Sequence, residues 1–186
     1  MAITGLPHYT QSKASRNLYE PVHKNLFEVT ILPPSGVAGS DMLLEHVLNI
    51  GGLDAINPSV DAVGQKYKFA DRSFAGMPGQ TFLDVSITFS LNLNDANQMY
   101  IYKTIQDWYK KMYNPANGEM GLKKEYTGTM VVVEYNRKGD IYRKITLKDV
   151  FLTGTLGGPG EHDYTATDPI QLAVTIRCDH WDEELS

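Results

Sequence analysis

The feature that most constrains the fold is the stretch TFLDVSITFSLNLND, residues 81–95, in which apolar and polar side chains alternate throughout. A period of two is typical of a β-strand with one buried face and one exposed face. At ~3.3 Å per residue, an unbroken strand would reach roughly 45 Å, whereas ordinary strands have about 5–6 residues. The apolar face comprises Leu83, Val85, Ile87, Phe89, Leu91 and Leu93, and the polar face comprises Asp84, Ser86, Thr88, Ser90, Asn92 and Asn94.

Several other segments of the chain also predict strands. Pro and Gly mark their ends, and a Gly-containing turn, NRKGD, joins two of them as a hairpin. The segment MLLEHVLNI, residues 42–50, fits either a strand or a short helix. The further predicted strands are residues 25–32, 127–135, 141–152 and 170–181.

One long helix is expected after the alternating stretch. Ile101, Ile105 and Trp108 recur at helical spacing, and Asn94 or Asp95 would cap the N-terminus. NPANG, residues 114–118, would end the helix, and Lys103 and Asp107 are spaced to pair on its outer face.

Together these elements predict a mainly β fold. It would be a two-sheet antiparallel β-sandwich or barrel with one flanking α-helix. We expect residues 1–24 to form an N-terminal arm and residues 25–186 to form a single domain.

Composition limits the function classes. The chain has 186 residues, a formal net charge of −5 and a single cysteine, Cys178. The negative charge argues against a general nucleic-acid binder, and one cysteine allows no intrachain disulfide. The N-terminal residues contain no apolar signal-peptide core and the chain contains no membrane-length apolar run, so we expect folding in a cytoplasm without a membrane partner.

The sequence offers no catalytic residue, no metal site and no cofactor site. The histidines are scattered along the chain without metal-ligand spacing. The glycine-rich segment GTLGGPG, residues 154–160, lacks the Gly-Lys-Ser/Thr of a phosphate-binding loop. Because no nucleophile can be matched with a base, we do not expect an enzyme.

A short basic and aromatic segment, residues 64–76, lies between glycine-marked bends. It should form an extended arm or a hairpin. It is a candidate contact between subunits, in which the aromatic rings would anchor in a neighbour and the cations would face acidic groups such as those of DHWDEE, residues 179–184. The candidate contact residues are Lys66, Lys68, Phe69, Arg72 and Phe74.

In order, these segments resemble the tail tube proteins of contractile-tailed bacteriophages. The resemblance runs from NLFEVTI (residues 25–31) through QKYKFADRSFAG (residues 65–76) and the alternating strand. It continues in the helix containing DWY (residues 107–109) and closes at VTIRCDHWDEE (residues 174–184). The N-terminal arm and residues 33–63 are longer than this pattern leads one to expect.

The resemblance implies that six copies form a ring and that rings stack into a hollow tube inside the virion tail. It implies a homo-oligomer assembled in the host cytoplasm, with tail sheath, baseplate tube-initiating, tape measure and tail terminator proteins as partners. DNA would pass through the tube passively. Ring closure would also protect strand edges, which otherwise promote aggregation.

The channel wall would be a polar strand face. Either Asp84, Ser86, Thr88, Ser90 and Asn92 or the outward face of the last strand would line it. Small neutral and acidic groups suit this role, because each Lys or Arg that contacts a phosphate adds affinity for DNA.

Other functions also fit this pattern. A baseplate or terminator protein of the same fold would cap the tube without repeating along it. The tube of a contractile injection system would pass protein. From another class, a small-ligand or carbohydrate-binding β-barrel would need a cavity lined by polar and aromatic groups.

Overall fold

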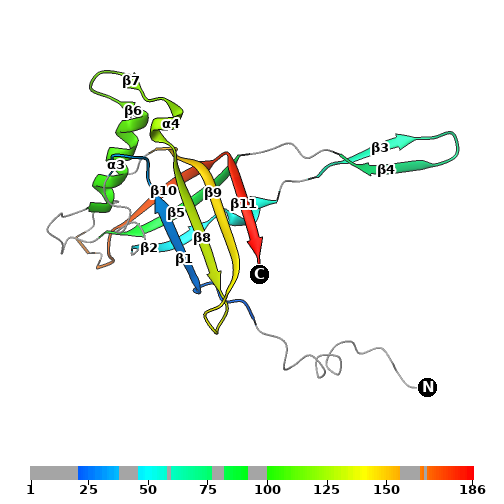
Figure 1. The fold of residues 1–186 in the computed structure, drawn as a ribbon, viewed down its shortest axis with the longest axis horizontal. Helices are drawn as coiled ribbons and strands as arrows, with labels where there is room; N and C mark the ends of the chain where they lie inside the picture. The colour runs from blue at the N-terminus through cyan, green and yellow to red at the C-terminus, as the bar shows by residue number, and fades with distance from the viewer. Residues whose placement is uncertain are drawn as a thin grey trace.

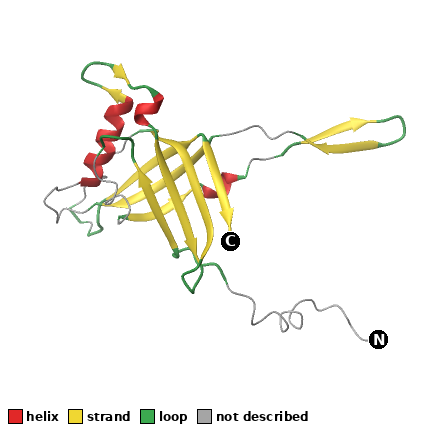
Figure 2. Ribbon diagram, viewed as in Figure 1, coloured by secondary structure: helices red, strands yellow, loops and turns green. Residues whose placement is uncertain are grey.

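The structure of the protein is a computed structural model that describes residues 21–37, 46–57, 60–76, 82–91, 100–155, 164–165 and 167–186. These residues form a two-layered β-sandwich with the two α-helices at one end and a hairpin that projects from the other side (Figures 1 and 2). The strands are β1 (Phe27–Leu32), β2 (Val47–Gly51), β3 (Ala62–Lys66), β4 (Asp71–Ala75), β5 (Leu83–Ser90), β6 (Tyr113–Asn114), β7 (Glu119–Met120), β8 (Gly128–Tyr135), β9 (Ile141–Thr153), β10 (Gln171–Cys178) and β11 (His180–Leu185). The helices are η1 (Leu53–Ile56), α3 (Tyr100–Met112) and α4 (Lys123–Tyr126).

The main strands pair only in antiparallel fashion, which confirms the predicted mainly β class. We call β1, β8, the first part of β9 and β11 sheet A, and we call the last part of β9, β10, β5 and β2 sheet B. Strand β9 belongs to both sheets, because it pairs with β11 over Arg143–Lys148 and with β10 over Phe151–Thr153. β10 and β11 keep one register against β9, so they act as one long strand that bends between the layers.

The bend is centred on Asp149. Its φ of 55° is the only positive φ of a non-glycine residue among the described residues, and the register of β8 against β9 shifts beside it. Such a β-bulge bends a strand and switches which side chains face inward. Accordingly, Ile145 and Leu147 are buried before the bulge, and Val150 and Leu152 after it.

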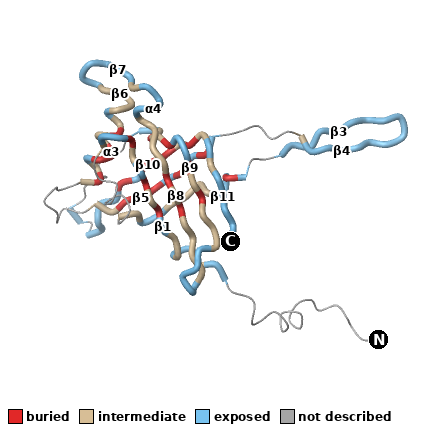
Figure 3. Tube along the Cα trace, in the orientation of Figure 1, coloured by how far each residue is buried: buried red, intermediate tan, exposed pale blue. Residues whose placement is uncertain are grey.

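The core lies between the two sheets and follows the alternation seen in the sequence (Figure 3). In β5, the side chains of Leu83, Val85, Ile87 and Phe89 are at most 1% exposed. The opposite wall of the core includes Val29 of β1. Burying side chains of this size contributes about 1.5–3 kcal/mol each, so the alternating pattern largely determines the core.

The predicted length of the strand over residues 81–95 is wrong. β5 ends at Ser90, because its partner β10 begins only at Gln171; a single further bond joins the Leu91 amide to the Ile170 carbonyl. Residue 81 and residues 92–95 lie outside the described part. In the described part of the chain the longest strand is β9, with 13 residues. Its bulge interrupts the alternation that makes a long strand easy to recognise.

Helix α3 covers one end of the sandwich with the residues that its spacing predicted. Ile101, Ile105 and Trp108 are buried, and the Trp108 indole N–H donates a hydrogen bond to the Tyr126 carbonyl at 2.7 Å. The predicted pairing of Asp107 with Lys103 is wrong, since Asp107 instead pairs with Lys110 at 3.3 Å, one turn toward the C-terminus. The proposed capping residues, Asn94 and Asp95, lie outside the described residues.

The structure also places two further features of the sequence. The undecided segment of residues 42–50 contains a strand, β2, in its described part. Cys178 is 1% exposed, and burial raises the pKa of its thiol to about 11, so it behaves as a small core side chain.

Candidate assembly surfaces

The basic and aromatic segment forms a hairpin, β3–β4, whose strand residues are all exposed (Figures 1 and 3). We call this hairpin the arm. The cross-strand pairs Val63–Phe74 and Gln65–Arg72 lie on one face, and the Tyr67 hydroxyl donates a hydrogen bond to the Gln65 side chain at 2.8 Å. One face of the arm is therefore apolar and basic, with no covering layer among the described residues.

The tip of the arm presents an aromatic ring flanked by cations. The Phe69 side chain is 91% exposed, and the Lys68 ammonium lies 5.5 Å from its ring centre. The Arg72 guanidinium lies 5.8 Å from the Tyr67 ring centre. An exposed aromatic group of this kind is unusual on an isolated domain and is typical of an interaction site.

The predicted polar face of β5 lies on the outer side of sheet B. Asp84, Ser86, Thr88 and Ser90 are exposed or half-buried, and they pair across the strands with Arg177, Thr175, Ala173 and Gln171 of β10. Cross-strand partners point to the same side of a sheet. The β5 face and the β10 part of the predicted last strand are therefore a single face, whereas the β11 part lies in sheet A. Asn92 lies outside the described residues.

The formal charges on the strands of this face cancel. Arg177 donates two hydrogen bonds to the Asp84 carboxylate, at 2.7 and 2.8 Å, and it lies 5.4 Å from the Phe82 ring centre. The hydrogen bond from Arg177 holds the pKa of Asp84 below its usual value. The remaining side chains on β5 and β10 are small and neutral, so this surface offers phosphate groups no free cation.

The outer side of sheet A is different, because it carries ion pairs between β9 and β11. Lys148 pairs with Asp182, and Lys144 pairs with Glu184 at 3.5 Å. On β8, Tyr135 donates a hydrogen bond to Glu28 of β1 at 2.8 Å.

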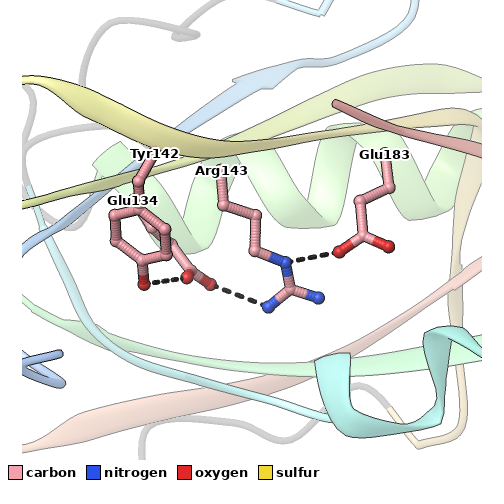
Figure 4. A network of polar contacts seen from close by, with 4 residues as sticks. All are labelled: Glu134, Tyr142, Arg143 and Glu183. Atoms are coloured by element: carbon pink, nitrogen blue, oxygen red, sulfur yellow. Dashed lines mark hydrogen bonds and ion pairs between the residues drawn. The ribbon is translucent and has the colours of Figure 1, made fainter. Parts of the chain in front are cut away.

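A polar network that the sequence analysis missed lies on the inner side of sheet A, at the open end of the sandwich (Figure 4). Arg143 bonds Glu183 at 2.6 Å and Glu134 at 3.2 Å, and Tyr142 donates a hydrogen bond to Glu134. The side chains of Arg143, Glu134 and Glu183 are only 20–26% exposed. Burial, reinforced by the nearby carboxylate, raises the pKa of Tyr142 to about 12.

Neither a metal site nor a membrane-spanning helix is found where the structure is described. Within those ranges, no group of three His, Cys, Asp or Glu side chains is placed to hold a metal ion. None of the helices there has the length and apolar character needed to cross a bilayer.

The comparisons with known proteins identify the fold. No protein-family model and no curated protein sequence matches the chain. A chain of the sheath–tube complex of the PVC extracellular contractile injection system in its extended state is 12% identical, with a TM-score of 0.59 over 97% of this chain and all of that one. A chain of the tube-terminating cap of the anti-feeding prophage is also 12% identical, with a TM-score of 0.60 over the whole of both chains. A chain of the PVC sheath/tube terminator is 13% identical, with a TM-score of 0.59 over 90% of this chain and 99% of that one. The protein thus has the fold of contractile injection system tube and tube-terminator chains, as the resemblance implied.

Proposed function

We propose that the protein is a structural subunit that self-assembles into rings of six copies, stacked as the inner tube of a phage tail. The observation that carries this proposal is the fold, which is shared over nearly the whole chain with chains of tube and tube-cap assemblies. In this role the subunit catalyses no reaction, and it is built into the virion after assembly in the host cytoplasm.

Open strand edges support assembly. β1 and β2 each pair with one strand only, and no described strand covers their outer edges. Unpaired edges are templates for pairing with another chain. A closed ring satisfies them through a head-to-tail contact, and stacking requires a second contact between different surfaces.

The outer face of sheet B is our candidate for the channel wall. On β5 and β10 the outward side chains are small and neutral apart from the Asp84–Arg177 pair, so DNA would slide past without counterion-release binding. The arm, with Lys66, Lys68, Phe69, Arg72 and Phe74, is our candidate for a contact between subunits.

A tube terminator is the second candidate function. The likeness to the anti-feeding prophage cap is as close as the likeness to the sheath–tube complex. The two functions differ in copy number, since a tube subunit repeats along the tail and a terminator forms one end. In either case we expect contact with sheath, baseplate tube-initiating, tape measure and terminator proteins. Quantitative mass spectrometry of purified tail particles distinguishes the two roles.

Electron microscopy of the purified protein tests the proposal. We expect rings or tubes from the wild-type chain and a folded monomer from Phe74→Asp, because a charge would replace a ring on the apolar face of the arm. Met120→Asp is the matched control: Met120 is 80% exposed on the separate β6–β7 hairpin, so this variant should still assemble. Tubes of Phe74→Asp would refute the role of the arm. A wild-type chain that neither assembles nor occurs in tail particles would refute the function.

A further inference from the structure

A cavity opens between the two sheets at the unclosed end of the sandwich. It has a volume of about 410 Å³ and lies between β1, β2, η1, β8 and the start of β9. Its lining includes the apolar side chains of Phe27, Ile50, Leu53 and Val132 and the acidic side chains of Asp54 and Glu134. A dry cavity of about 150 Å³ already binds benzene, so this one has room for an aromatic side chain with its neighbours.

We propose that this cavity receives the tip of the arm from a second copy of the chain, with Phe69 as the anchor. The inference rests on the proposed function in one respect, namely that the chain self-assembles. It goes further by naming the surface that the arm meets. The contact is head-to-tail, because an arm and a cavity are different surfaces of one molecule.

Charge complementarity favours this occupant. Between Ala62 and Ala75 the arm carries Lys66, Lys68 and Arg72 against a single acid, Asp71. Two carboxylates line the cavity. Glu134 is already bonded to Arg143 and Tyr142, whereas Asp54 forms no ion pair within the described part of the chain. Lys24 also lines the cavity, so the acidic excess is one charge.

Two other hollows fit the arm less well. A hollow near α3 is lined by Ser35, Lys111, Lys124 and Glu125, and its two lysines would repel a basic tip. A smaller hollow of about 260 Å³ is lined by Arg137 and contains no carboxylate. The cavity between the sheets therefore combines apolar walls with acidic groups in a way that the other two do not.

The arm cannot fill the cavity of its own chain in this conformation. It extends away from the sandwich along the longest dimension of the molecule, so its tip is remote from both sheets (Figure 1). A neighbouring molecule is therefore the partner that brings the two features together.

Cross-linking between two chains that carry a cysteine at different positions tests this contact. Ala70→Cys, at an exposed position beside Phe69 that leaves its ring in place, and Leu53→Cys are purified separately, mixed and assembled. A short bis-maleimide reagent is then added, because the inserted Phe69 ring would hold the backbones too far apart for a disulfide. We expect a 70–53 cross-linked dimer in the mixture and none with either variant alone. Cys178 is buried and protonated, so it does not react. Met120→Cys in place of Leu53→Cys is the control and should give no cross-link with Ala70→Cys.

The outcomes separate the inference from the proposed function. Rings or tubes without a 70–53 cross-link would overturn the cavity contact and leave the tube function standing. A wild-type chain that neither assembles nor occurs in tail particles would remove both. As an independent readout, Phe69→Ala should raise the protein concentration needed for half-assembly by about ten- to a hundredfold, as for a hot-spot residue. An unchanged assembly concentration would also overturn the contact.

Discussion

Sheets A and B bury their inner faces in the same core, but their outer faces differ in side-chain size and charge. Sheet A carries the pairs Lys144–Glu184 and Lys148–Asp182. On β5 and β10, sheet B carries small neutral side chains and one closed ion pair, Asp84–Arg177. Core packing demands only that alternate positions be apolar, and it leaves the outer positions free. The difference between the outer faces therefore reflects what each face meets, which we propose is DNA for sheet B.

The largest effect should come from making the outer face of sheet B basic. In the double variant Ser86→Lys, Thr88→Lys, assembled tubes should bind a short DNA duplex at least about tenfold more tightly at low salt, since each phosphate contact contributes a slope of about −0.9 to the dependence of log K on log salt. Fluorescence anisotropy at low and high salt measures the affinity and the slope.

The matched control places the same charges on the outer face of sheet A. Thr30→Lys, Thr146→Lys alters two half-buried positions on that side, each paired with Val131 of β8. Its gain in DNA affinity should be much smaller if sheet B alone lines the channel. Equal gains from the two double variants would contradict the assignment of the channel wall to sheet B.

A second prediction compares the two arginines that neutralise carboxylates. Arg143→Ala leaves Glu134 and Glu183 half-buried without their shared cation, which should lower the free energy of unfolding by about 2–3 kcal/mol. Arg177→Ala should cost less, because both members of the Asp84–Arg177 pair are more exposed. Urea unfolding of both variants measures the difference, and equal losses would show that burial does not separate the two sites.

Some of these features could be read from the sequence and others could not. The buried face of β5, the arm as a hairpin and the apolar face of α3 follow from local periodicity, which needs no knowledge of the partner strands. The bend at Asp149 and the end of β5 at Ser90 depend on pairing between distant segments. The polar network was missed for the same reason, since Glu134, Arg143 and Glu183 come from three strands that only the fold brings together.

The smallest effect should come from Tyr142→Phe, and it should depend on pH. The pKa of Tyr142 is raised to about 12 in the folded chain, above its usual value of 10.0, so the folded state holds this proton more tightly than the unfolded state. The resulting stabilisation is complete below about pH 10 and is lost as the pH rises toward 12. The wild-type chain should therefore be more stable than Tyr142→Phe at neutral pH, by about 1 kcal/mol for the lost hydrogen bond. Urea unfolding at a series of pH values should show this advantage shrinking above pH 10.

The control is Tyr135→Phe, which removes a more exposed tyrosine bonded to Glu28 on the outer side of sheet A. Its stability should differ less from that of the wild type. If the stability difference between the wild type and Tyr142→Phe stays constant up to pH 12, the pKa of Tyr142 is not higher in the folded chain than in the unfolded chain.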